Sequence, residues 1–259
     1  MNGIIEFSHV SAGYGPGKEN EILHDLTFCI PEGKSVCILG RNGSGKTTLL
    51  RVMAGLLPHT GEIRIGGKIL QEMKRKEIAS RVALMAQFSE LYFSYTVYET
   101  VLLGRYAGSD SLFGTPSRKD RAAAMECLEK TGLLPMKDRQ ITELSGGQLQ
   151  RVFLARTMAQ DTPVMLLDEP ANHLDLQYKK ELIDYLKEWD AVPGHTSVGV
   201  FHDISLAISY ADILIFLKEG RIAAQGETKE LLRADLLKEV YGIDVASYMQ
   251  ELLKQWENI

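Results

Sequence analysis

The sequence predicts an α/β fold built on an open, mostly parallel sheet. Apolar runs at 35–39, 164–167 and 197–201 have the composition of strands that are buried on both faces. Segments of helical periodicity separate these runs, and this alternation is typical of a parallel sheet covered by helices. With 259 residues, of which 45% are hydrophobic and 24% charged, the chain is long enough for a substantial core, and we expect one domain over 1–259.

The remaining elements follow from hydrophobic periodicity and from turn residues. We expect further strands at 4–7, 26–30, 61–65, 81–86, 213–217 and 221–224, and helices at 48–54, 74–80, 97–103, 118–130, 148–159, 176–189 and 247–259. From about 88 to 159 the patterns are mainly helical, whereas strands and helices alternate on both sides of this segment. Because ligands of open α/β sheets bind at the carboxyl ends of the strands, residues that directly follow a strand are the candidate site residues.

A helical tail is expected over about 228–259. Its last part places Tyr248, Leu252 and Trp256 on one stripe at helical spacing. Such a stripe predicts a helix that caps the core, with dimerisation or regulation as the alternatives.

A glycine-rich loop follows the strand at 35–39. It consists of Gly40, Arg41, Asn42, Gly43, Ser44, Gly45, Lys46 and Thr47, with Thr48 next, and has the spacing of a phosphate-binding loop. The helix that follows would direct its unpaired N–H groups and its positive dipole end at an anion. Lys46 can reach the β- and γ-phosphates, and the Thr47 hydroxyl is a candidate Mg²⁺ ligand. An unliganded glycine-rich turn is the alternative, but the strand before and the helix after the loop favour nucleoside triphosphate binding.

Two acidic residues, Asp168 and Glu169, end the apolar run 164–167. At a strand end both carboxylates can approach the phosphate loop. We assign Asp168 to Mg²⁺ and Glu169 to the attacking water, as general base. A solvated acidic turn is the alternative, but acids that directly follow a buried strand face the ligand edge of the sheet.

Three further residues are candidates on weaker grounds. The Gln87 amide follows the strand at 81–86 and can offer its oxygen to Mg²⁺ and its NH₂ group to water. His202 follows the strand at 197–201 and can hydrogen-bond the γ-phosphate and the attacking water, although a structural histidine is the alternative. The Tyr14 ring, in a glycine-rich loop, can either stack on adenine or pack on its own neighbours.

A second anion-binding helix start is predicted at Ser145. This residue is a typical N-cap, and Gly146, Gly147 and Gln148 follow it at the start of a helix. Because the chain already has a phosphate loop, a second such site is useful only if it serves the nucleotide of another molecule. In a head-to-tail dimer each Ser145 helix would close on the ATP that the other copy holds.

With Leu144-Ser145-Gly146-Gly147-Gln148 in place, the sequence resembles the ATP-binding cassette (ABC) ATPases over nearly its whole length. The resemblance implies a P-loop NTPase core, an N-terminal antiparallel β subdomain and an inserted α-helical subdomain at about 88–159. It implies ATP and Mg²⁺ as ligands and a homodimer. It also assigns family motifs by residue: 40–48 as Walker A, Gln87 as the Q-loop glutamine, 164–169 as Walker B, 172–175 as the dimer loop that ends at Asp175, His202 as the switch histidine, and Tyr14 as the adenine-stacking aromatic. Arg41, where proline is common, and Ala171, where serine or threonine is common, depart from the family pattern.

A narrower resemblance is to the ATPase subunits of bacterial importers for iron-siderophores, haem and cobalamin. Segments 96–105, 202–207 and 237–245 carry it. It implies integral-membrane permease subunits as partners, with Tyr92, Phe93 and Tyr95 as the socket for a permease helix, and indirectly a substrate-binding protein. Packing of these rings within their own subdomain is the alternative. The rival functions are a soluble ABC ATPase of the cofactor-assembly type, a chromosome-maintenance ATPase and a P-loop kinase.

Composition restricts the partners and the location. The net charge of −5 gives no basic face for nucleic acid, so no nucleic-acid partner is expected. The first residues lack the features of a signal peptide, and no run reaches the ~18 apolar residues of a membrane helix. We therefore expect a cytoplasmic protein that lies peripherally on the inner face of the cell membrane through its partners.

Overall fold

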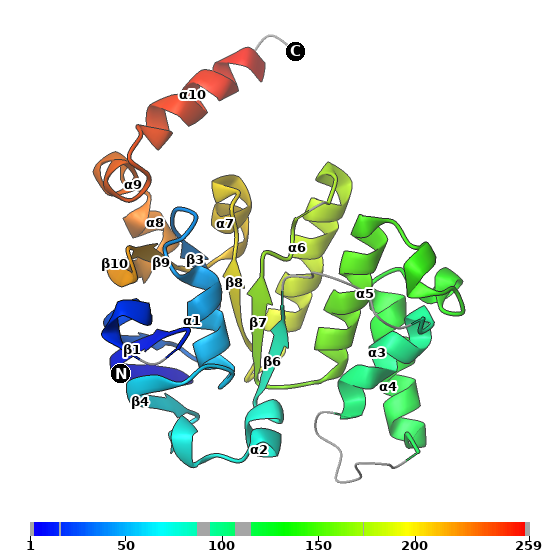
Figure 1. The fold of residues 1–259 in the computed structure, drawn as a ribbon. Coiled ribbons are helices and arrows are strands. Elements are labelled where there is room, and N and C mark those ends of the chain that lie inside the picture. Colours follow the sequence, from blue (N-terminus) through cyan, green and yellow to red (C-terminus); the bar gives the residue numbers. More distant parts are fainter. Residues whose placement is uncertain (1–2, 16, 87–93, 107–114, 173, 257–259) are drawn as a thin grey trace.

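The computed structural model describes residues 3–15, 17–86, 94–106, 115–172 and 174–256. Two β-sheets and a separate group of helices make up the body, and a helical tail leaves it at one end (Figure 1). None of the helices in these ranges is long and apolar enough to cross a membrane.

The larger sheet has six strands in the order β10-β9-β3-β8-β7-β6. Their bounds are β3 (Ser35–Leu39), β6 (Val82–Met85), β7 (Val164–Asp168), β8 (Thr196–Val200), β9 (Ile213–Lys218) and β10 (Arg221–Glu227). All neighbours pair in parallel except β10, which returns antiparallel to β9. This arrangement confirms the predicted mostly parallel sheet, and it directs the carboxyl ends of β3, β6, β7 and β8 to one edge.

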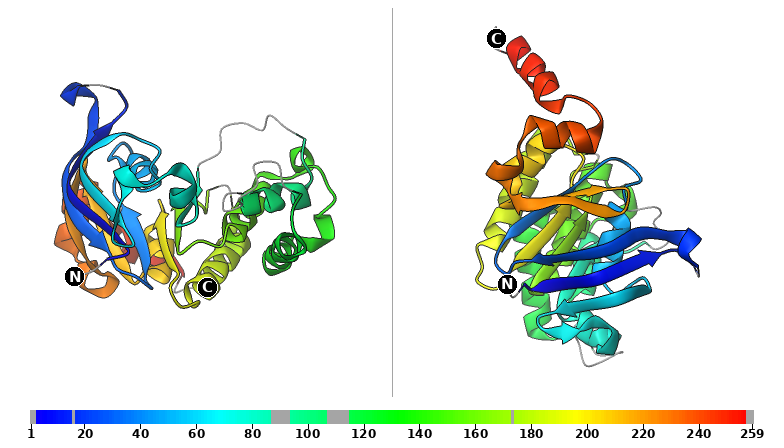
Figure 2. Two further views of the ribbon diagram at one scale, coloured as in Figure 1. Left: turned by 90° about the horizontal axis from the view of Figure 1, so that it is seen from below. Right: turned by 90° about the vertical axis from the view of Figure 1, so that its left-hand side faces the viewer.

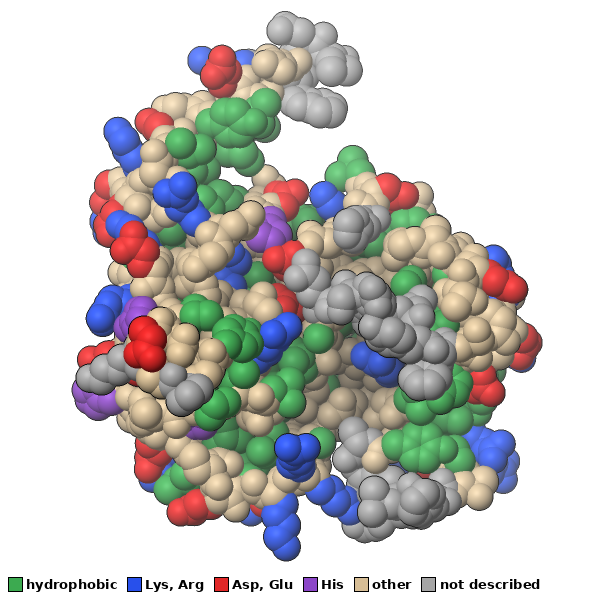
Figure 3. Space-filling model, viewed as in Figure 1, with side chains coloured by type: hydrophobic (Ala, Val, Ile, Leu, Met, Phe, Trp, Pro, Cys, Tyr) green, Lys and Arg blue, Asp and Glu red, His purple; other side chains and the backbone are tan. Residues whose placement is uncertain are grey.

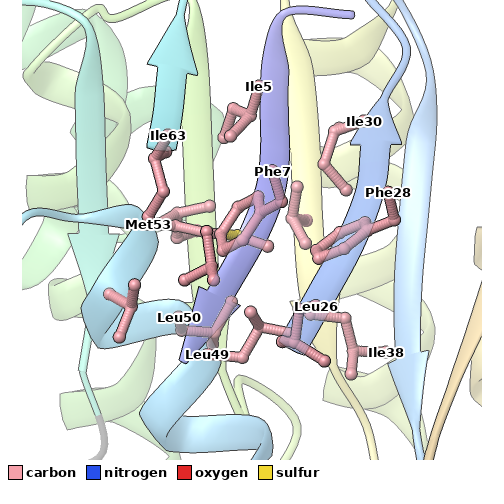
Figure 4. Close-up of a cluster of buried hydrophobic side chains, with 14 of the residues drawn as sticks. Ile5, Phe7, Leu26, Phe28, Ile30, Ile38, Leu49, Leu50, Met53 and Ile63 are labelled. Carbon is pink, nitrogen blue, oxygen red and sulfur yellow. The ribbon is translucent and has the colours of Figure 1, made fainter. Parts of the chain in front are cut away.

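The smaller sheet is antiparallel, in the order β2-β1-β4-β5. It contains β1 (Ile5–Gly13), β2 (Glu21–Ile30), β4 (His59–Ile65) and β5 (Lys68–Ile69), with a 3₁₀ turn, η1 (Lys18–Asn20), between the first two strands. Helix α1 (Lys46–Met53) lies between the two sheets, where Leu49, Leu50 and Met53 pack into one core with Phe7 and Phe28 (Figure 4). The rings of Phe7 and Phe28 stack with centroids 4.5 Å apart. The antiparallel N-terminal sheet is thus confirmed.

Helices α3 (Val97–Tyr106), α4 (Arg118–Lys130) and α5 (Gly146–Ala159) are inserted between β6 and β7 and have their own core. Figure 2 shows them on the opposite side of the larger sheet from the antiparallel sheet. Two short 3₁₀ turns, η3 (Leu134–Met136) and η4 (Ile141–Glu143), connect α4 to α5, whereas η2 (Leu70–Glu72) and α2 (Arg75–Ala79) precede β6.

A second core cluster covers the face of the larger sheet that points away from the antiparallel sheet. Leu186, Trp189, Phe201 and Tyr210 are all buried there. Helices α6 (Leu176–Asp190) and α7 (Ile204–Tyr210) supply part of it. The tail consists of α8 (Thr228–Leu231), α9 (Ala234–Tyr241) and α10 (Val245–Trp256), of which α9 packs Leu237 and Val240 into this cluster.

Three differences from the sequence prediction have clear causes. Helix α1 begins at Lys46 and not at Thr48, because Gly45 already adopts a left-handed N-cap conformation. Helix α7 was not predicted because it has only seven residues; Asp203 caps it through the backbone N–H groups of residues 205 and 206. The prediction that the last helix caps the core is wrong, because Tyr248 is 55% and Leu252 is 37% exposed.

Candidate active site

The ends of β3, β7 and β8 bring the phosphate loop and two of the predicted catalytic residues together. These strands are neighbours in the larger sheet, and Gly40, Glu169 and His202 follow them within two residues. A cavity of about 410 Å³ opens at this edge. The residues that line it are Ile22, Asn42, Gly43, Gly45, Lys46, Thr47, Thr48, Glu169 and His202.

Two glycines fix the path of the loop. Gly45 has φ 102° and caps α1 without any side-chain hydrogen bond, so the first N–H groups of this helix remain available to an anion in the cavity. At Gly40 a Cβ atom would lie 2.1 Å from the backbone oxygen of Leu217. Only glycine therefore allows the end of β3 to pass so close to β9.

Lys46 is the cation of the cavity. Its side chain lies back along the loop, where Nζ donates to the carbonyl oxygens of Gly40 at 2.8 Å and Arg41 at 2.9 Å. Burial lowers the pKa of Lys46, whereas the carboxylates of Glu169 and Asp168 oppose this effect. Within the same loop the buried Ser44 hydroxyl has no hydrogen-bond partner. A phosphate group would supply the negative charge and acceptor oxygens that this loop lacks.

Thr47 and Asp168 form the pair that fits a Mg²⁺ ion. The Thr47 hydroxyl donates to Asp168 Oδ1 at 3.0 Å, so two oxygen ligands already lie next to each other. Asp168 is 3% exposed, and burial raises its pKa, while the hydrogen bond from Thr47 lowers it. A bound cation would stabilise the ionised form of this buried carboxylate. The third predicted metal ligand, Gln87, lies outside the described residues.

Glu169 is held by its neighbours on two sides. Its backbone has φ 53°, and its N–H donates to the carbonyl of Val200 at 3.1 Å, which turns the side chain away from the line of β7. Asn172 Nδ2 donates to one carboxylate oxygen and His202 Nε2 is hydrogen-bonded to the other. Glu169 and His202, which were predicted separately as catalytic residues, are therefore in direct contact. The role of Asn172 in holding Glu169 was not predicted, because only the turn after β7 brings the two together.

Tyr14 lies over α1 and does not line the cavity. Its hydroxyl accepts a hydrogen bond from Arg51 Nη1 at 2.9 Å, and the guanidinium carbon of Arg51 is 5.8 Å from the ring centroid. The ring remains 46% exposed. Neither Arg51 nor Ile22, the only hydrophobic side chain among the described residues that line the cavity, was predicted from the sequence. The place of each of these two side chains in the site depends on how β1 and β2 pass over α1.

The Ser145 helix start faces solvent at a different place. Ser145 and Gln148 form a reciprocal capping box, in which the Ser145 hydroxyl accepts from the Gln148 N–H at 3.3 Å and Gln148 Oε1 accepts from the Ser145 N–H at 3.0 Å. Ser145 and Gly146 are exposed, and among the described residues the cavity lining contains none from 145 to 148. Gln150 Nε2 donates to the carbonyls of Glu169 and Pro170, which ties the first turn of α5 to the end of β7.

Asp175, the residue predicted for the dimer loop, is the exposed N-cap of α6. Its Oδ1 accepts a hydrogen bond from the Tyr178 N–H at 2.9 Å. The roles predicted for Asp175 and for residues 145–148 are contacts with a second chain. In the single chain Asp175, Ser145 and Gly146 are exposed.

Comparison with known proteins gives the class to which this arrangement belongs. A family model described as "ABC transporter" matches residues 23–172. A solved dimeric structure of the ATP-binding cassette MJ0796, in a post-hydrolysis state with ADP and Pi, has a TM-score of 0.77 and 28% identity, and covers 86% of this chain and 98% of that one. The chain therefore belongs to the ABC transporter family and is one of its ATPases, and it binds ATP.

Individual relatives are similar over almost all of the chain. The ferric enterobactin transport ATP-binding protein FepC of Escherichia coli (strain K12) is 38% identical over 235 residues, which are 90% of this chain and 85% of that protein. The iron(3+)-hydroxamate import ATP-binding protein FhuC of Bacillus subtilis (strain 168) is 37% identical over 241 residues, or 93% and 88%. With the uncharacterised ABC transporter ATP-binding protein YvrA of the same Bacillus subtilis strain the identity is 37% over 243 residues, but the match spans only 54% of that longer protein.

Proposed function

We propose that this protein is the ATP-hydrolysing subunit of a bacterial importer, and that it acts as a head-to-tail homodimer beneath a separate permease. The observation that carries the dimer is the position of the Ser145 helix start, which is exposed and apart from the chain's own cavity. In a head-to-tail pair this helix start would close on the triphosphate bound at Lys46 of the other copy. On one chain alone the Ser145 helix start would have no nucleotide to bind.

The predicted site residues, in the cavity and beside it, have separate parts in the proposed hydrolysis. Lys46 and the first N–H groups of α1 bind the phosphates, and the Tyr14 ring stacks on the adenine. Mg²⁺, held by Thr47 and Asp168 with Gln87 as a further ligand, would neutralise phosphate charge. Glu169 accepts a proton from the water that attacks the γ-phosphorus, while Asn172 and His202 hold its carboxylate in place. His202 and Gln87 would also contact that water.

The transported solute is proposed from the relatives. Both FepC and FhuC are named for the import or transport of iron chelates, and we infer the same solute class here, iron-siderophore, haem or cobalamin. The permease would bind the α3 side of the inserted helices, where Tyr95, Leu103 and Tyr106 are 39–41% exposed. Tyr92 and Phe93 lie outside the described residues. A substrate-binding protein would act through the permease, and the chain would lie at the inner face of the membrane.

The experiment that tests the site and the dimer uses Glu169→Gln. This change removes the proton acceptor and leaves the phosphate loop intact, so we expect hydrolysis to fall at least ~100-fold while ATP still binds. With ATP and Mg²⁺ the variant should accumulate as a dimer in sedimentation velocity. A strictly monomeric variant under saturating MgATP would contradict the head-to-tail arrangement.

A soluble ABC ATPase of the cofactor-assembly type is the second candidate. The exposed apolar residues on α3 favour a membrane partner, and therefore a transporter subunit over a soluble ATPase. Copurification of the tagged chain with a polytopic membrane protein supports the transporter. Recovery only with soluble partners from detergent-solubilised membranes would favour the second candidate.

A further inference from the structure

Helix α10 carries an apolar face that the described part of the chain covers only at its start. Val245, at its start, is buried and Met249 is half-buried against the second core cluster. Beyond them Tyr248, Leu252 and Leu253 are 55%, 37% and 63% exposed. These positions recur every three to four residues, so they share one side of the helix.

The direction of this face is visible in the figures. Helix α10 leaves the body on the side to which β7 and β8 point, which is the side of the candidate active site (Figure 1). In Figure 3 the hydrophobic side chains of α10 gather where the helix faces the hollow above that edge. The apolar face therefore looks over the surface on which the proposed second copy would lie.

An isolated helix of twelve residues is marginally stable in water, and its stability in proteins comes mostly from packing of its apolar face. Among the described residues, helix α10 makes such packing through its first turns, at Val245 and Met249. A partner that covers Tyr248, Leu252 and Leu253 would supply what the single chain lacks.

We propose that the apolar face of α10 packs against a second copy of this chain and holds the two copies together at the strand-end edge. This inference rests on the dimer of the proposed function, with which the α10 face is continuous. A membrane surface fits less well, because residues 245–256 contain one acid, Glu251, and one base, Lys254, whereas helices that lie on membranes are rich in Lys and Arg.

The second copy offers an exposed apolar residue at the same edge. Leu176, the first residue of α6 after the Asp175 cap, is 83% exposed. In a twofold symmetric pair each α10 covers the equivalent surface of the other copy, so any change in the helix acts twice. Because this contact involves no phosphate, it would persist when the nucleotide sites open.

The test compares two double variants in the full chain that carries Glu169→Gln. Leu252→Glu with Leu253→Glu places two charges on the apolar face. Ser247→Glu with Gln250→Glu is the matched control, since it adds the same charge on the exposed opposite side of α10. Sedimentation equilibrium gives the dimer Kd with MgATP and without nucleotide, and circular dichroism and ATP binding check that both variants are folded.

We expect the leucine variant to raise the dimer Kd by about tenfold or more in both conditions, because two apolar contacts are lost on each side of a symmetric interface. The control should stay within about twofold of the parent, since 0.4 kcal/mol corresponds to that factor. Hydrogen exchange should show protection of amides 248–256 on dimerisation.

The outcomes separate the inference from the proposed function. Equal dimer Kd values for the two double variants, with no protection of α10, would overturn the inference while the MgATP dimer stands. A parent that never dimerises with MgATP would overturn the proposed function itself.

Discussion

At the site, burial shifts the pKa values of single residues. Burial lowers the pKa of Lys46 and raises the pKa of Asp168, so each ionised form is destabilised where it lies. Both costs are offset when anionic phosphate lies against Lys46 and a cation lies against Asp168. Lys46 and Asp168 thus favour binding of phosphate and cation together over binding of either one alone.

Thr47→Val tests this coupling at the residue scale. Valine keeps the shape of threonine but removes the hydroxyl that donates to Asp168. We expect ATP affinity measured with Mg²⁺ to fall about tenfold, the effect of one lost oxygen ligand worth ~1.4 kcal/mol. Affinity measured in EDTA should change less than twofold. Thr47→Ser is the control that retains the hydroxyl, and equal losses in both buffers would show that Thr47 does not serve the metal.

Single elements are anchored by buried polar groups at their ends. At the end of α6, Asp190 Oδ2 accepts a hydrogen bond from the Ser197 hydroxyl of β8 at 2.6 Å, and Ser197 is also hydrogen-bonded to the Tyr210 hydroxyl of α7. Asp190 Oδ1 is buried without a partner. Burial, with Asp212 nearby, raises the pKa of Asp190 to about 6, so the anchor is most favourable when Asp190 is protonated.

Asp190→Asn tests this anchor through its pH dependence. A raised pKa means that the stabilising contribution of Asp190 is present below its unfolded pKa near 4 and is lost as the pH rises through about 6. Asparagine is neutral throughout and can still accept from Ser197. In urea unfolding we expect the variant to match the wild type near pH 4 and to exceed it above pH 7 by up to about 3 kcal/mol, two pKa units at 1.36 kcal/mol each.

The control for this prediction is Asp184→Asn on the exposed side of α6. It should leave the pH profile of stability unchanged. The prediction fails if Asp190→Asn follows the wild-type profile from pH 4 to 8.

At the scale of the whole molecule, the nucleotide edge is assembled from parts that are distant in the sequence. Helix α1 lies between the two sheets, the catalytic residues follow β7 and β8, and the Ser145 helix start belongs to the inserted helices. Because Lys46 is the first residue of α1, a ligand bound to it is connected through this helix to both sheets.

Bound nucleotide should stabilise the whole fold by linkage. At MgATP concentrations about a hundredfold above Kd, the stabilisation is about 2.7 kcal/mol, which corresponds to a rise in Tm of ~5–10 °C for a chain of this size. Scanning fluorimetry with and without MgATP measures it. Lys46→Ala should abolish the shift, whereas a shift of equal size in that variant would place the nucleotide elsewhere.

The sequence by itself determined the parallel sheet, the loop from Gly40 to Thr48, and the residues that end β7 and β8. These features are local: a glycine spacing, a buried strand and the polar residues after it are readable without knowledge of the fold. The Ser145 cap was readable for the same reason, since a capping box involves residues three apart.

Only the tertiary structure decided which distant side chains meet. The contact of Glu169 with His202 and the hydrogen bond from Arg51 to Tyr14 depend on strand order and on how the elements pack. Asn172 is only three residues from Glu169, but their contact depends on the turn after β7, in which Glu169 has φ 53°. The exposure of α10 could not be predicted, because a stripe of Tyr248 and Leu252 has the same spacing whether a core or another molecule covers it. Helical periodicity predicts that one face of a helix is apolar. What packs against that face depends on the tertiary structure.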